Sequence, residues 1–127
     1  PTVPVLELVT VVELEEVPRS TRARLTIAQV NAAVVDIQKA TEQRHAFLSK
    51  PRNKMSQKQM ARLAELQKQQ VPAHGGEPFI AESDLRVLPA FKKGEVTAKA
   101  LIATLRSLKR LKVVRAAGMM TYVVIGK

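Results

Sequence analysis

The stretch that decides the fold is "VTAKALIATLRSLKRLKVV", residues 96–114. Its apolar residues recur at three- and four-residue steps, which predicts a helix with one side in the core. That side consists of Ala98, Leu101, Ile102, Leu105 and Leu108. Residues 92–115 contain eight basic residues and one acid, Glu95, whereas an ordinary solvated helix face mixes both signs. The segment therefore predicts a core helix whose other surface faces a polyanion.

Short elements are predicted on both sides of this helix. Before it, "FIA" (79–81) indicates a strand and "ESDLRVL" (82–88) a short helix. Thr97 is the predicted N-cap of the basic helix. After it, the β-branched residues of "LKVVRAAGMMTYVVIG" (111–126) predict two strands joined by a turn at Ala117 and Gly118.

The order helix, turn, helix, hairpin resembles the winged helix-turn-helix superfamily. The residues that carry the likeness are "DLRVLPAFKKGEVTAKALIATLRSLKRLKVVRAAGMMTYVV" (84–124), about the last third of the chain. The resemblance implies that the second helix lies in the DNA major groove and that the hairpin forms the wing. Two features depart from the commoner pattern: no glycine separates the helix from the hairpin, and the tip "AAGMM" carries no cation. The tip therefore favours contact with a protein partner through Met119 and Met120.

Two basic segments supply the candidate nucleic-acid contacts. A helix that reads the groove needs small residues where it approaches closely, and Lys or Arg where it meets guanine edges or phosphates. A second basic segment around Pro51 can contact phosphates without reading sequence, although a solubilising loop is an equal alternative there. The predicted contacts are Lys50, Arg52, Lys54, Lys92, Lys93, Thr97, Lys99, Ala103, Arg106 and Arg110.

The N-terminal half predicts a strand and a long helix. Alternation in "VLELVTVVEL" (5–14) indicates a half-buried strand. Thr26 followed by Gln29 is a capping-box pattern, which begins a helix from about Ile27 to Leu48. Its narrow apolar stripe predicts either a dimer seam or an ordinary core face. The stripe consists of Ile27, Val30, Val34 and Ile37.

A linker is predicted at residues 71–78, "VPAHGGEP", because this segment holds two prolines and two glycines. The chain then divides into residues 1–70, an N-terminal part with the strand, helices and dimerising arm, and residues 79–127, the winged-helix module.

Composition excludes several classes of protein. There is no cysteine, which removes disulfide frameworks, thiolate zinc sites and cysteine nucleophiles. Aromatic residues make up 3% of the chain, too few for modules that stack bases on aromatic side chains. No apolar run reaches the roughly 18 residues of a membrane helix, and the apolar N-terminus lacks the basic start of a secretion signal. The two histidines, His45 and His74, show no metal-ligand spacing.

Charge is unevenly distributed. The net charge is +10, yet residues 1–17 contain four glutamates and no Lys or Arg. An acidic start and a basic remainder are typical of a protein with a polyanion partner.

These observations predict an α+β protein with a C-terminal winged helix-turn-helix and an N-terminal strand and long helix that form a homodimer. The predicted function is a DNA-binding regulator of transcription, replication or partition, cytoplasmic or nucleoid-associated. Alternatives are a ribosome-associated RNA-binding winged-helix protein, or an adaptor that docks a polymerase-type machine through the apolar wing. No catalysis, cofactor, metal or membrane association is expected.

Overall fold

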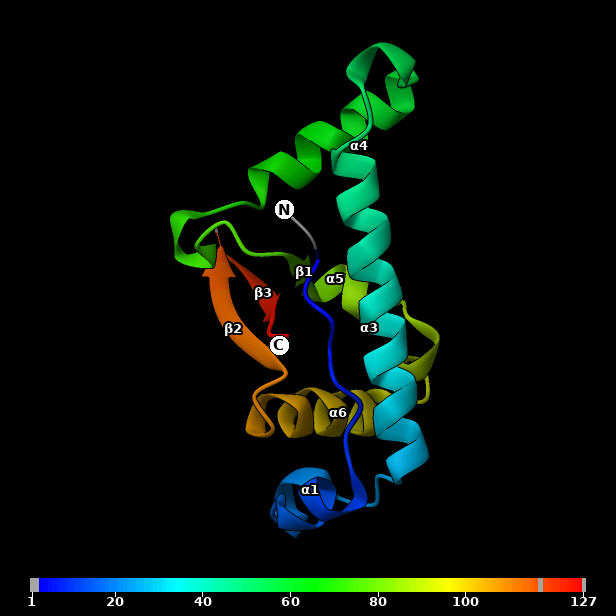
Figure 1. Ribbon diagram of the computed structural model, residues 1–127, viewed down its shortest axis with the longest axis vertical. Coiled ribbons are helices and arrows are strands. Elements are labelled where there is room, and N and C mark those ends of the chain that lie inside the picture. The colour runs from blue at the N-terminus through cyan, green and yellow to red at the C-terminus, as the bar shows by residue number, and fades with distance from the viewer. Residues whose placement is uncertain (1–2, 117, 127) are drawn as a thin grey trace.

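The computed structural model describes residues 3–116 and 118–126, which form an α+β fold (Figure 1). Its helices are α1 (Val11–Glu16), α2 (Arg19–Arg22), α3 (Ile27–Leu48), α4 (Gln57–Lys68), α5 (Glu82–Leu85) and α6 (Glu95–Ser107). Its strands are β1 (Phe79–Ala81), β2 (Leu111–Ala116) and β3 (Met119–Val124). Short 3₁₀ helices are η1 (Arg52–Lys54), η2 (Pro72–His74) and η3 (Pro89–Phe91). Within the described ranges, no helix combines the length and apolar character needed to cross a membrane.

The sheet is antiparallel with the strand order β1-β3-β2. Phe79 pairs with Val123, and Leu111 pairs with Val124. The predicted hairpin is confirmed as β2 and β3. At its turn Gly118 has a φ of 81°, which favours glycine, while Ala117 lies outside the described residues. The order α5, α6, β2, β3 follows the predicted order of elements; the winged-helix arrangement itself stays a prediction.

The long helix α3 begins at the predicted capping box. The Thr26 backbone N–H donates to Gln29 Oε1 at 2.8 Å, and the Gln29 N–H donates to Thr26 Oγ1 at 3.2 Å. Figure 1 shows α3 running beside the sheet and past it, with α4 folding back at the far end.

The apolar stripe of α3 belongs to the core of the chain itself. Val30, Val34 and Ile37 are at most 1% exposed, and Ile27 packs against the same core. The predicted dimer interface at these four residues is therefore wrong, because the N-terminal segment and α6 already cover this face.

The predicted N-terminal strand is also wrong. Residues 3–10 run along α3 without strand pairing (Figure 1), and Val11–Glu16 form α1 behind a capping box made by Thr10 and Glu13. Side-chain amides of α3 satisfy the extended backbone instead: the Leu6 N–H donates to Gln38 Oε1 at 2.8 Å. Asn31 Oδ1 accepts from the Val9 N–H at 2.7 Å, and Asn31 Nδ2 donates to the Val9 carbonyl at 3.0 Å.

The predicted linker is packed against the sheet. His74 is 4% exposed, and its Nε2 lies 2.7 Å from Thr121 Oγ1 of β3. One hydrophobic core joins residues from Leu6 to Val124. The N-terminal part and the C-terminal module therefore share this core rather than forming separate units.

Candidate polyanion-binding face

A shallow groove lies where the C-terminal end of α6 meets β2. The residues at its floor are small or apolar, and three basic side chains line it. The groove is lined by Thr21, Ala103, Arg106, Ser107, Lys109, Leu111, Lys112, Val113 and Ile125. We call it the basic groove.

The three cations of the basic groove are free to meet a partner. Arg106, Lys109 and Lys112 are exposed, and none forms an ion pair within the described ranges. Unneutralised charges of one sign in a hollow raise the local potential and attract the opposite charge.

Lys109 is held in a backbone conformation that usually belongs to glycine. Its φ is 60°, and it ends α6 in a Schellman motif. The Arg110 N–H donates to the Leu105 carbonyl at 2.9 Å, and the Lys109 N–H donates to the Arg106 carbonyl at 3.0 Å. A left-handed residue other than glycine costs about 1–2 kcal/mol. Such strain is often found at functional sites.

A second group of cations adjoins the groove. Arg19, Arg22 and Arg24 line a depression around α2, which packs against α6. Thr21 of α2 also lines the basic groove, so the two hollows are neighbours. We call this group the arginine cluster, and the groove and cluster together the basic face. The cluster was not among the predicted contacts, although "RSTRAR" (19–24), three arginines in six residues, is a visible signal.

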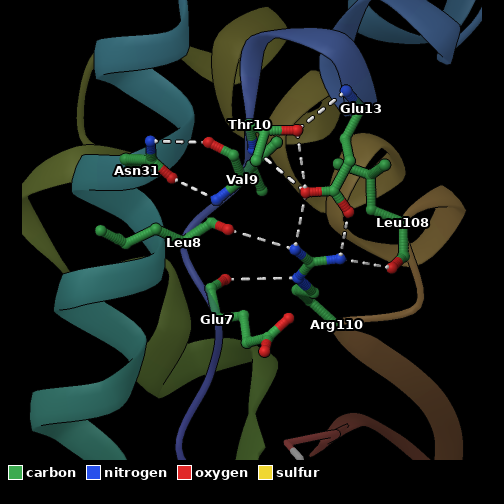
Figure 2. A network of polar contacts seen from close by, with 8 residues as sticks. All are labelled: Glu7, Leu8, Val9, Thr10, Glu13, Asn31, Leu108 and Arg110. Carbon is green, nitrogen blue, oxygen red and sulfur yellow. Dashed lines mark hydrogen bonds and ion pairs between the residues drawn. The ribbon is translucent and has the colours of Figure 1, made fainter.

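Arg110, a predicted nucleic-acid contact, has a structural role instead. Figure 2 shows its guanidinium enclosed by the N-terminal segment. Its Nε donates to the Glu7 carbonyl at 3.3 Å, and its Nη2 donates to the Leu8 carbonyl at 3.2 Å. Nη1 donates to the Leu108 carbonyl at 3.1 Å. Nη1 and Nη2 also grip the Glu13 carboxylate at 3.0 and 3.2 Å. The prediction for Arg110 is therefore wrong, since these contacts employ all three nitrogens.

This network also changes the acidity of Glu13. The hydrogen bonds from Arg110 are the main cause, followed by the hydrogen bond from the Thr10 N–H, and together they lower the pKa of Glu13 from 4.5 to about 2. Glu13 therefore stays ionised at all but strongly acidic pH, and it holds α1 against the end of α6.

The other predicted residues do not gather at the basic groove. Lys92 and Lys93 are exposed at the opposite end of α6, about 20 Å away for a helix of this length. Thr97 is half-buried within the first turns of α6, and the N-cap is Gly94 rather than Thr97. Lys99 is exposed and pairs weakly with Glu95 at 3.9 Å.

The basic loop and the hairpin tip do not line the basic groove either. The segment that joins α3 to α4 lies at the end of the projection formed by these two helices (Figure 1). It contains Lys50, Arg52 and Lys54, and Lys50 Nζ donates to Gln59 Oε1 at 3.3 Å. Met119 is 37% exposed and Met120 is half-buried at the start of β3. Contacts at these positions remain predictions.

The described part of the chain brings together no group of three or more His, Cys, Asp or Glu side chains able to hold a metal ion.

Comparison with known proteins identifies the family. A family model described as "Spindle and kinetochore-associated protein 1" matches residues 2–118. The protein named SKA complex subunit 1 from Xenopus tropicalis is 25% identical over 119 residues, which cover 94% of this chain and 47% of that relative. The Mus musculus protein of the same name is 26% identical, covering 94% of this chain and 46% of that relative. The chain thus spans about half the length of the relatives it matches.

This match corrects the resemblance to a winged-helix DNA-binding family. The family model covers most of the chain and names a spindle and kinetochore protein, so membership of that superfamily's DNA-binding families is wrong. The predicted regulator of transcription, replication or partition, its RNA-binding and polymerase-docking alternatives, and the duplex DNA partner are wrong for the same reason. Positive charge pointed to an acidic partner but could not say which one. The chain belongs to the spindle and kinetochore-associated protein 1 family.

Proposed function

We propose that this chain is a microtubule-binding module of a spindle and kinetochore assembly, and that the basic face is its contact surface. Its relatives are named as subunits of the SKA complex, and the family is named for the spindle and the kinetochore. Spindles are built from microtubules, whose outer surface and protruding tubulin tails are acidic. A surface that binds them must present unneutralised cations.

The observation that carries the proposal is the pairing state of the cations on the basic face. In the described ranges, Arg86, Lys99 and Arg110 pair with carboxylates, whereas the exposed cations of the groove do not. Glu15 and Glu16 of the nearby α1 form no ion pair with the arginine cluster either. Exposed like charges repel one another unless a partner of opposite sign neutralises them.

The groove can contact apolar atoms of a protein partner as well as its negative charges. Its floor includes Ala103, Leu111, Val113 and the partly exposed Ile125, so a partner can bury apolar atoms between the cations. A basic residue, Lys109, occupies a strained backbone position, which supports a role in binding. The role is structural rather than catalytic, and its place is the spindle and kinetochore inside the cell rather than a nucleoid.

The test is co-sedimentation with stabilised microtubules at several salt concentrations. The variant Arg106→Glu, Lys109→Glu, Lys112→Glu should lose at least about tenfold in affinity, since exposed charge pairs contribute about 0.2–1 kcal/mol each and reversal adds repulsion. The affinity of the parent should fall as salt rises, because exposed charges are screened.

The matched control is Lys39→Glu, Lys58→Glu, Lys68→Glu, which makes the same charge change at exposed positions of α3 and α4. It should lose much less affinity than the groove variant. A third variant, reversed at Lys50, Arg52 and Lys54, measures whether the tip of the projection shares the contact. If the folded groove variant binds microtubules as tightly as the parent, the basic groove is not the contact surface.

A further inference from the structure

β2 is an edge strand, with β3 on one side and no strand on the other in the described sheet. Just before β2 begins, the Ile125 N–H donates to the Arg110 carbonyl at 3.0 Å, so this carbonyl points toward the β3 side. In an antiparallel pair the direction of the backbone groups alternates along the strand. The N–H and carbonyl of Lys112 therefore point toward β3, and those of Val113 and Arg115 point outward.

The outer edge of β2 is open along the second half of the strand. Leu111 is 2% exposed and therefore covered, but Val113 is half-buried and Arg115 is exposed. No hydrogen bond from residues 3–116 or 118–126 reaches the outward backbone groups of Val113 and Arg115. Figure 1 shows β2 as the outermost strand of the sheet. Unpaired backbone groups of this kind are a template on which another extended chain can pair.

The basic groove leads onto this edge. Leu111, Lys112 and Val113 follow one another in β2, and all three line the groove. Successive side chains of a strand point to opposite faces of the sheet, so a hollow lined by three in a row extends around the edge of the strand. The groove and the open edge therefore meet at Val113, and one extended ligand can contact both.

Basic side chains flank the open edge on both faces of the sheet. Lys112 and Arg115 are exposed and three positions apart in β2, which places them on opposite faces. Neither forms an ion pair with any residue that the structure describes, and the same holds for Lys109 in the groove. A strand paired with this edge would have a cation close to each of its own two faces.

These cations decide which kind of chain can pair with β2. Two copies of the same edge would bring like charges together, and charged side chains on an edge strand commonly prevent such pairing. An acidic strand instead neutralises the cations on both faces, because its own side chains also alternate between the faces. The charges of the edge therefore favour an acidic partner and oppose a second copy of this chain.

We propose that an extended acidic peptide pairs with the outer edge of β2, adds a strand to the sheet and runs into the basic groove. Its backbone exchanges hydrogen bonds with Val113 and Arg115, and its carboxylates lie beside Lys109, Lys112 and Arg115. In such strand addition the backbone bonds supply affinity and the side chains supply selectivity. The inference rests on the proposed function, which makes the peptide an acidic tail that protrudes from the microtubule.

The first probe is acetyl-hexaglutamate amide, compared with two N-methylated forms that carry the same charge. Methylation of every backbone nitrogen removes every donor, whereas methylation of alternate nitrogens leaves one edge of the peptide able to pair. In calorimetric titrations at low salt, the fully methylated form should bind at least about fivefold more weakly than hexaglutamate. The alternately methylated form should retain most of the affinity. Equal binding of all three peptides would show that charge alone attracts them and would overturn the strand pairing.

Hydrogen exchange followed by NMR locates the pairing on the chain. The N–H groups of Val113 and Arg115 point outward, so saturation with hexaglutamate should slow their exchange at least about tenfold. The N–H of Lys112 already points toward β3 and serves as the internal control, whose exchange should change little. Unaltered exchange at Val113 and Arg115 with saturating peptide would refute the site.

Val113→Pro tests the same edge by a change in the chain. Proline removes the outward N–H and leaves every charge in place, and it is tolerated on the outer side of an edge strand. The folded variant should bind hexaglutamate at least about fivefold more weakly, whereas Val113→Thr keeps the N–H and should bind like the parent. Undiminished binding in folded Val113→Pro would sink the assignment; should this variant not fold, the methylated peptides decide.

Microtubules with and without their acidic tails separate this inference from the proposed function. Folded Val113→Pro should bind intact microtubules about fivefold more weakly than the parent, and both should bind protease-trimmed microtubules alike. An equal loss on both kinds of microtubule would show that the tail is not the added strand. If the charge-reversed groove variant binds microtubules like the parent, the proposed function fails, while the hexaglutamate measurements still decide on strand pairing.

Discussion

Residues 106–112 contain basic side chains in two different environments, unpaired and paired. Arg106 and Lys112 are exposed and without ion pairs in the described ranges, whereas Arg110 is enclosed by the N-terminal segment and grips Glu13. The residue types and their neighbours in sequence do not distinguish them. What distinguishes them is the segment that lies opposite in space. A cation paired by its own chain stabilises the fold, and one left unpaired is available to a partner.

The largest expected effect comes from Arg110→Ala. It removes four hydrogen bonds that join the end of α6 to the N-terminal segment and α1, and a fifth to the Leu108 carbonyl. We expect the free energy of unfolding to fall by about 2 kcal/mol, because charged hydrogen bonds are lost and the Glu13 carboxylate loses its partner. Urea unfolding followed by circular dichroism measures it.

Lys112→Ala is the matched control for this comparison. As an exposed change it should alter stability by no more than about 0.5 kcal/mol, yet it should weaken microtubule binding about two- to fivefold. If the two variants destabilise the chain equally, the distinction between paired and unpaired cations does not hold.

A smaller effect on the free energy of unfolding is expected when pH is lowered. The pKa of Glu13 is lowered from 4.5 to about 2, so its ion pair with Arg110 contributes in full above about pH 4.5 and is lost as pH falls toward 2. The Glu13 side chain is 35% exposed, so solvent screening limits the contribution to about 1 kcal/mol.

The variant Glu13→Gln isolates this contribution from other carboxylates, such as Glu95, whose pKa Arg86 also lowers. The parent should be more stable than the variant at pH 7, and the difference should shrink steadily between about pH 4.5 and 2. Urea midpoints measured across this range test it. A difference that does not change with pH would show that the carboxylate charge is not what holds the network.

Local patterns predicted the parts of the fold that depend on neighbouring residues. The capping box at Thr26, the core side of α6 and the hairpin of β2 and β3 are all confirmed. Each depends on spacing within a few residues, and such patterns are readable without the fold.

The errors concern residues that meet across long separations. The apolar residues of 5–14 suggested a strand, but residues 11–14 belong to α1, and amides of α3 bond to the backbone of Leu6 and Val9. Arg110 looked like part of a binding helix, but its partner Glu13 is 97 residues away. The arginine cluster joins the groove only because α2 packs on α6. Among the residues of the basic face, the predicted contacts therefore include Arg106 and Ala103. They include neither Lys109 and Lys112 nor the arginine cluster.

The smallest expected effect on stability comes from substitution of Lys109, an unpaired cation that lies next to the paired Arg110. Lys109→Gly relieves the left-handed conformation, which costs a lysine about 1–2 kcal/mol, but it also makes the unfolded chain more flexible. We expect a net gain in stability of about 0.5 kcal/mol. The same change removes a charge from the basic groove, so microtubule binding should weaken about two- to fivefold.

Lys109→Ala separates the two consequences, because it removes the charge and keeps the φ of 60°. Both variants should therefore lose binding alike, while only the glycine variant gains stability in urea unfolding. A gain in stability without any loss of binding would mean that Lys109 does not contact the partner and that its strain needs another explanation. A loss of binding with the gain in stability would show that the chain keeps a strained lysine where glycine fits better, because the charge at that position is used.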